Sequence, residues 1–134
     1  MKVILNKCFG GFGLSYEAYK LYAKKKGLEL FAYELGPNLT YRRANAKESF
    51  LVTYTTRDCG DNPKFTDETE WKDVLYLSSE HREDPVLIEV VEELGDEANT
   101  TFSNLRIVDI PDGMDYVIDE YDGIETLHAR VKEW

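Results

Sequence analysis

Basic residues, cysteine and long hydrophobic runs are all scarce in this sequence. Its 134 residues include 16 Lys and Arg against 26 Asp and Glu, a formal net charge of −10. Such a chain repels the nucleic-acid backbone, so we expect no binding to DNA or RNA polymers. No apolar run is long enough to cross a bilayer, and the stretch MKVILNKCF lacks the features of a signal peptide. We therefore expect a cytosolic protein without a membrane partner.

Potential metal ligands and nucleophiles are few. The two cysteines, Cys8 and Cys59, lie far apart, and His81 and His128 are the only histidines. No pair of the four has the spacing of a metal site, so we expect neither a metal nor another cofactor. No known signature of a thiol nucleophile surrounds either cysteine, and the sequence gives no local support for catalysis. In a reducing compartment both thiols are expected to be free.

The sequence does contain enough apolar residues for a hydrophobic core. Apolar residues make up 43% and aromatic residues 13%, which suits a single domain over residues 1–134. One helix is predicted over about 15–26, where Ser15 is a good N-cap and Gly27 a stop signal. A second is predicted from the cap Asp84 to Gly95, with an apolar stripe at helical spacing. Two glutamates in its last turn oppose the helix dipole and hint at a nearby cation.

Short apolar runs bounded by turn residues predict the strands. A turn is predicted at 36–38, a polar connection at 44–49 and a loop at 57–65, whereas 67–77 fits either a short helix or a strand. The last three predicted strands have the turn spacing of an antiparallel meander. The expected fold is α+β, a mostly antiparallel β-sheet with two main α-helices packed on it. The strands are predicted at 3–5, 28–35, 39–43, 50–56, 105–110, 116–121 and 124–131.

The stretch NKCFGGFGLS at 6–15 is the first candidate site. Two glycines ahead of a helix start can turn backbone N–H groups toward an anion, and Lys7 adds a cation. Phe9 and Phe12 could stack on a flat ring. The alternative is a glycine-rich turn whose aromatic residues enter the core. The spacing matches neither common nucleotide-binding fingerprint, so the pattern by itself favours the turn.

Two further segments offer polar groups that could bind a ligand. Arg82 lies just before the second predicted helix and could grip a phosphate or carboxylate, although a solvated turn explains it equally well. The loop NTTFSN at 99–104 combines donors, acceptors and Phe102 as a stacking face. An ordinary connection between helix and strand is the alternative there. Arg57, beside Cys59, is a further cation.

Three segments together resemble a known family. VILNKCFGGFGLS, REDPVLIEVVEELGDEAN and LRIVDIPDGMDYVIDEYDG, in this order, resemble a family of small phage and prophage proteins that includes the first type of Thoeris anti-defence protein. The resemblance covers well over half of the chain and adds little over 36–79. It implies a non-catalytic protein that sequesters a cyclic ADP-ribose isomer, glyco-cyclic ADP-ribose, made by TIR-domain enzymes in the cytoplasm of the infected bacterium. It also implies that some members take up cyclic oligonucleotide-type signals.

The resemblance further implies a homo-oligomer built from dimers, with the ligand between protomers. Two alternatives stay open, a hydrolase of such a signal and an acidic inhibitor of a host protein. The aromatic rings would stack on the base, the glycine backbone and cations would meet phosphates, and the polar side chains would read ribose or the base edge. The candidate ligand-binding residues are Asn6, Lys7, Phe9, Gly10, Gly11, Phe12, Arg57, Arg82, Asn99, Phe102, Ser103 and Asn104.

Overall fold

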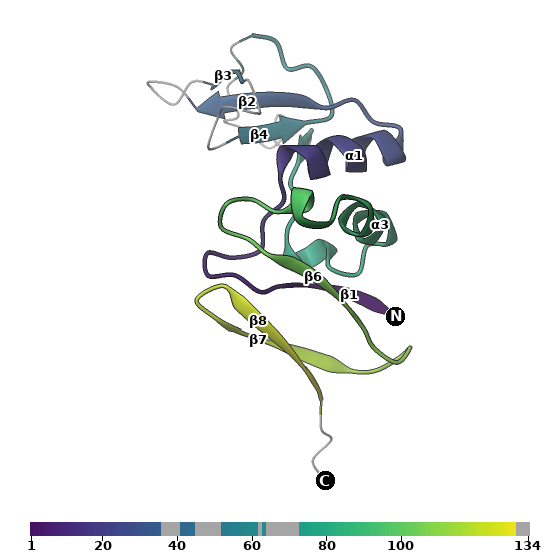
Figure 1. The fold of residues 1–134 in the computed structure, drawn as a ribbon. Helices are drawn as coiled ribbons and strands as arrows, with labels where there is room; N and C mark the ends of the chain where they lie inside the picture. The colour runs from purple at the N-terminus through teal and green to yellow at the C-terminus, as the bar shows by residue number, and fades with distance from the viewer. Residues whose placement is uncertain (36–40, 45–51, 62, 64–72, 131–134) are drawn as a thin grey trace. The chain divides into compact units, whose positions relative to one another are not determined.

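The chain folds into two compact α+β units. The computed structural model describes residues 1–35, 41–44, 52–61, 63 and 73–130. One unit comprises Met1–Ala18 and Leu77–Trp134, and the other, Tyr19–Tyr76, is inserted between these two segments of the chain (Figure 1). Every strand pairing that the described residues form is antiparallel, so the predicted α+β class is confirmed. The expectation of one domain over 1–134 stays a prediction, because two units can belong to one domain.

The first unit contains two two-stranded ladders. Strand β1 (Lys2–Asn6) pairs with β6 (Leu105–Asp109) over five residues, from Lys2 opposite Asp109 to Asn6 opposite Leu105. Strands β7 (Tyr116–Tyr121) and β8 (Ile124–Ala129) form a hairpin (Figure 1). The predicted meander of the last three strands is therefore wrong. Strand β6 pairs with the apolar strand β1 instead of with β7. The chain turns at Pro111 and Gly113, between β6 and β7.

Helix α3 (Pro85–Leu94) confirms the helix predicted over this part of the first unit. Asp84 accepts hydrogen bonds from the backbone N–H groups of Val86 and Leu87, and Gly95 is the C-cap. The apolar stripe buries four side chains, those of Leu87, Ile88, Val90 and Val91. The Nζ of Lys2 donates to both carboxylate oxygens of Glu92, at 3.0 and 3.1 Å. This pair supplies the cation that the glutamates of the last turn led us to expect.

Short 3₁₀ helices flank α3. Segment η2 (Ser79–His81) precedes it, and η3 (Gly95–Ala98) follows it directly.

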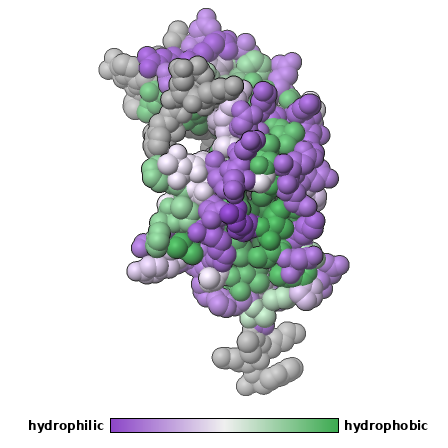
Figure 2. All heavy atoms as spheres, viewed as in Figure 1, coloured by the Kyte–Doolittle hydropathy of each residue, from purple (hydrophilic) through white to green (hydrophobic). Residues whose placement is uncertain are grey.

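The core of the first unit includes the cluster of Val3, Leu5 and Ile110, which partly buried apolar side chains surround. In Figure 2, green hydrophobic atoms reach the surface of the molecule among purple hydrophilic ones. No helix in the described ranges is long and apolar enough to cross a membrane.

The second unit contains a sheet and most of helix α1 (Tyr16–Lys26). Ser15 caps α1, as predicted, because its Oγ accepts a hydrogen bond from the backbone N–H of Ala18 at 3.2 Å. The sheet runs in the order β3-β2-β4-β5. The turn at 36–38, the polar connection at 44–49 except Ala44, and residues 62 and 64–72 of the segment 57–77 lie outside the described residues. The strands are β2 (Phe31–Leu35), β3 (Tyr41–Arg43), β4 (Val52–Thr55) and β5 (Val74–Leu75).

Candidate functional site

Asn6, at the end of β1, joins three segments of the first unit. Its side chain is fully buried. Its Nδ2 donates to the carbonyl oxygens of Cys8 and Gly123, at 2.9 and 2.6 Å, and its Oδ1 accepts from the backbone N–H of Asn104 at 2.9 Å. Its own backbone N–H donates to Glu125 at 2.8 Å. Both functional groups of the Asn6 amide are thus used inside the protein, where they hold the loop that follows β1.

The cations predicted near this loop also form hydrogen bonds within the protein. Arg82 donates from Nη1 and Nη2 to the two carboxylate oxygens of Glu125, at 3.2 and 2.8 Å, and from Nη1 to the carbonyl of Ile4. The Arg82 guanidinium also lies 5.5 Å from the ring centre of Phe12. Lys7 donates through Nζ to the backbone carbonyl of Glu125. These contacts fix Lys7, Phe12 and Arg82 close to β8. We call the internal contacts of Asn6, Lys7, Phe12, Arg82 and Glu125 the framework.

The two central glycines lie where three backbone segments meet. Gly10 and Gly11 have φ angles of +123° and +116°, which favour glycine. A Cβ on Gly10 would lie 2.7 Å from both the Cβ and the carbonyl oxygen of Phe102. A Cβ on Gly123, in the turn between β7 and β8, would lie 2.5 Å from the nitrogen of Gly11. The glycines therefore permit close packing of backbone against backbone.

The N–H of Gly10 is satisfied within the protein and needs no anion. The Gly10 N–H donates to the carbonyl of Asp122 at 3.1 Å. The start of α1 lies further along the chain, where Ser15 provides the cap and its own N–H donates to Ala98. The glycines therefore form a tight packing turn, as the second interpretation predicts, although Phe9 stays exposed instead of entering the core. Anion binding here stays a prediction.

The predicted loop at 99–104 is held mainly by its own polar side chains. Asn99 Oδ1 accepts from the N–H of Leu105 at 2.7 Å, and the buried Ser103 donates through Oγ to the carbonyl of Gly13 at 2.8 Å. Asn104 differs from both. Its Oδ1 is buried and has no hydrogen-bond partner among the residues that the structure describes. Asn99 and Ser103 thus join the framework, while the side-chain oxygen of Asn104 keeps its hydrogen-bonding capacity.

Phe9 and Phe102 present apolar rings to solvent. Their residues are 62% and 52% exposed, unusual values for large aromatic side chains. Phe9 directly precedes Gly10, and Phe102 is the residue that contacts Gly10. We call these two residues the aromatic rim. Asn6 holds the two segments that carry the rim through its hydrogen bonds with Cys8 and Asn104, while both rim residues stay exposed and accessible to a ligand.

Arg57 belongs to the second unit, unlike the other predicted site residues. Its Nε donates to Asp73 at 2.7 Å, and this hydrogen bond raises the pKa of the guanidinium. Its charge is thus paired within that unit. Sequence reasoning missed Glu125 and Gly123, which complete the framework from β8 and its turn. Gly123 lies between the last two predicted strands, where a turn is expected, but nothing local indicated its contact with Gly11.

The structure also shows where the groups considered for catalysis lie. Cys8 and Cys59 are free and partly exposed, and they belong to different units. Within the described ranges, no cluster of three or more His, Cys, Asp and Glu side chains is placed to hold a metal ion. No family model, curated protein or solved structure matches the chain.

Proposed function

We propose that this protein captures a cyclic ADP-ribose-type nucleotide at the aromatic rim and holds it without cleaving it. The observation that carries the proposal is the close approach of Gly10, the neighbour of the exposed Phe9, to the exposed Phe102. An aromatic side chain that stacks on a base contributes about 1–3 kcal/mol to binding. The resemblance of the three sequence segments to phage anti-defence proteins supports the same function. Its setting would be the cytoplasm of the infected bacterium.

The framework behind the rim suits tight binding. Asn6 holds the loop after β1 through hydrogen bonds to Cys8 and Gly123, and the Arg82–Glu125 pair joins the segment before α3 to β8. A site that is already ordered loses little conformational entropy when a ligand binds, so more of the contact energy appears as affinity. Slow release is what a sequestering protein requires.

The phosphates of such a ligand need cations that the rim does not supply. Lys7 and Arg82 are directed toward Glu125 rather than toward the exposed rings. We propose that a second copy of the chain provides the cationic contacts, with the ligand held between protomers of a dimer. The resemblance implies the same arrangement.

A second candidate function is inhibition of a basic host protein. Asp122 follows an acidic stretch of β7 that includes Asp119 and Glu120, and its carbonyl accepts from Gly10 beside the rim. Exposed aromatic residues bordered by acidic ones would also suit a basic protein surface. Such binding would weaken strongly as salt is added, whereas stacking of a base would weaken less.

The test is a capture-and-release experiment. The purified protein is mixed with the cyclic ADP-ribose isomer from a TIR-domain enzyme, freed of unbound ligand, denatured by heat and analysed by mass spectrometry. Protein denatured before mixing is the control. Intact ligand in near-stoichiometric amount is expected. A cleaved product would instead indicate a hydrolase, and the absence of bound ligand would contradict the proposal and favour a protein partner.

A further inference from the structure

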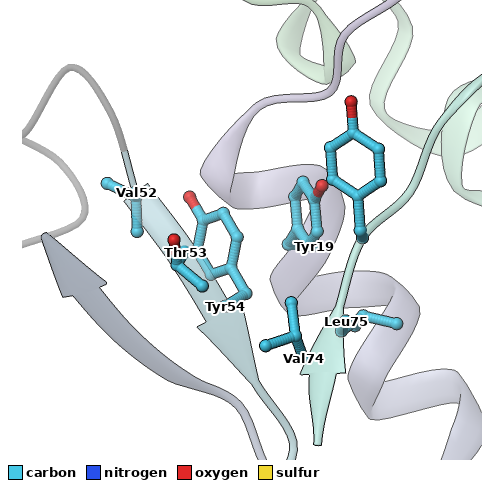
Figure 3. Close-up of a pocket in the computed structure, with 7 residues that line it drawn as sticks. Tyr19, Val52, Thr53, Tyr54, Val74 and Leu75 are labelled. Atoms are coloured by element: carbon cyan, nitrogen blue, oxygen red, sulfur yellow. The ribbon is translucent and has the colours of Figure 1, made fainter. Parts of the chain in front are cut away.

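The second unit contains a hollow that is separate from the aromatic rim. Its volume is about 520 Å³, within the range of small-molecule sites. All the described residues that line it belong to the second unit. They are Tyr19, Val52, Thr53, Tyr54, Val74, Leu75 and Tyr76 (Figure 3).

The hollow opens where two strands of unequal length part. Strand β5 pairs with β4 through two residues only, with Val74 opposite Thr55 and Leu75 opposite Tyr54. Strand β5 ends at Leu75, so Val52 and Thr53, the first residues of β4, extend past it. The sheet therefore leaves a recess at this edge, and side chains from β4, β5 and α1 surround it (Figure 3).

Aromatic rings form much of the wall. The rings of Tyr19 and Tyr54 stack with their centres 4.1 Å apart and an interplanar angle of 21°. Both residues are buried, so this pair is a fixed surface. Tyr76, by contrast, is 72% exposed. The pocket thus combines a rigid aromatic pair with a third ring that solvent reaches.

The seven described lining residues are uncharged. The described residues around the hollow include no Asp, Glu, Lys, Arg or His. An anion would find no cation among these described residues, in a chain whose formal net charge is −10. Flat rings stack favourably on tyrosine. A threonine hydroxyl, such as that of Thr53, can donate and accept hydrogen bonds. The lining therefore fits a neutral, planar and partly polar molecule.

We propose that this pocket is a second binding site, for a neutral planar heteroaromatic ring of the nucleoside class. Tyr76 stacks on the ring, and the other lining residues bury it. The proposal is independent of the function assigned to the aromatic rim, because it uses other residues, in the other unit, and a ligand without phosphate.

Adenosine is the probe, because it carries such a ring without a phosphate. Adenosine is titrated into protein with ¹³C-labelled tyrosine, and the tyrosine ring resonances are followed by NMR. Resonances of Tyr19, Tyr54 and Tyr76 are expected to shift together. Adenosine monophosphate is expected to bind more weakly, because the lining offers no cation. An absence of shifts at these three tyrosines, or tighter binding of the monophosphate, would overturn the proposal.

Variants identify the pocket as the site of binding. Tyr76→Ala is expected to weaken adenosine binding about five-fold or more, whereas Tyr76→Phe keeps the ring and the affinity. Tyr121→Ala, which removes a tyrosine of similar exposure (76%) from the first unit, is the matched control and should not change the affinity. Equal binding by wild type and Tyr76→Ala would overturn the proposal, and it would leave capture at the aromatic rim untouched.

Discussion

The guanidinium of Arg82 donates from both terminal nitrogens to the carboxylate of Glu125, although the two residues are 43 positions apart. The side chains are only 12% and 8% exposed. Each charge is stabilised by the other, because a buried charge without a partner lowers the stability of the fold by several kcal/mol. The pair ties the segment before α3 to β8, and Asn6 bonds to the same carboxylate. Much of the framework behind the aromatic rim therefore depends on it.

Removal of one partner of this pair should destabilise the protein. Arg82→Met is expected to lower the free energy of unfolding by about 3–5 kcal/mol, because Glu125 then stays buried and unpaired. Urea denaturation measures the loss. Arg106→Met is the control, since Arg106 pairs with Asp96 in an exposed setting and should cost at most about 1 kcal/mol. Similar losses in the two variants would contradict this account. A fully stable Arg82→Met that loses only ligand binding would place Arg82 in the ligand site instead.

Crowding at Gly123 should matter more than its backbone angle. Gly123 and Gly113 are both turn glycines with positive φ, +92° and +78°. A Cβ on Gly123 would meet the nitrogens of Gly10 and Gly11 at 2.7 and 2.5 Å, whereas a Cβ on Gly113 has no neighbour within 4 Å. Gly113→Ala should cost about 1–2 kcal/mol from backbone strain, and Gly123→Ala clearly more. Thermal unfolding compares the two. Equal melting temperatures would show that the glycine contact is not tight.

The stability of the second unit should depend on the ionisation of Asp58. The pKa of Asp58 is lowered, first because the Gly60 N–H donates to the carboxylate and then because Arg43 does. A carboxyl group with a lowered pKa in the folded state stabilises the fold above its ordinary pKa. This stabilisation is lost as the pH falls through the lowered value. We expect the carboxyl ¹³C resonance of Asp58 to titrate below the usual range.

Two variants check the origin of that shift. Arg43→Met should move the pKa of Asp58 toward its ordinary value, because one donor to the carboxylate is gone. Asp58→Asn should remove the corresponding part of the acid dependence of unfolding. An Asp58 that titrates in the usual range in the wild-type protein would show that these hydrogen bonds do not persist in solution.

The elements with local signals were predictable from the sequence. Ser15 and Asp84 mark two helix starts because a short oxygen-bearing side chain caps the free N–H groups there. The glutamates at the end of α3 oppose the dipole, and this local misfit correctly indicated a cation, which is Lys2. In each case the deciding interaction is local or leaves a mark on neighbouring residues.

The contacts between distant segments were not predictable in this way. The pairing of β6 with β1 rather than with β7, the Arg82–Glu125 pair and the packing of Gly123 on Gly11 join residues far apart in sequence. Nothing in the local pattern of either partner specifies the other. The sequence therefore marked Arg82 and Lys7 as polar groups of interest, but their direction into the protein depends on where β8 lies.

The most direct test of the proposed function is a calorimetric titration of the cyclic ADP-ribose isomer into wild type and Phe102→Ala. Phe102 is exposed, so its removal should leave the fold intact while weakening binding about ten-fold or more through loss of stacking. Leu35→Ala, which truncates a residue of nearly equal exposure (53%) in the other unit, is the control and should bind like wild type. Wild-type affinity in a folded Phe102→Ala variant would contradict the assignment of the aromatic rim as the ligand site.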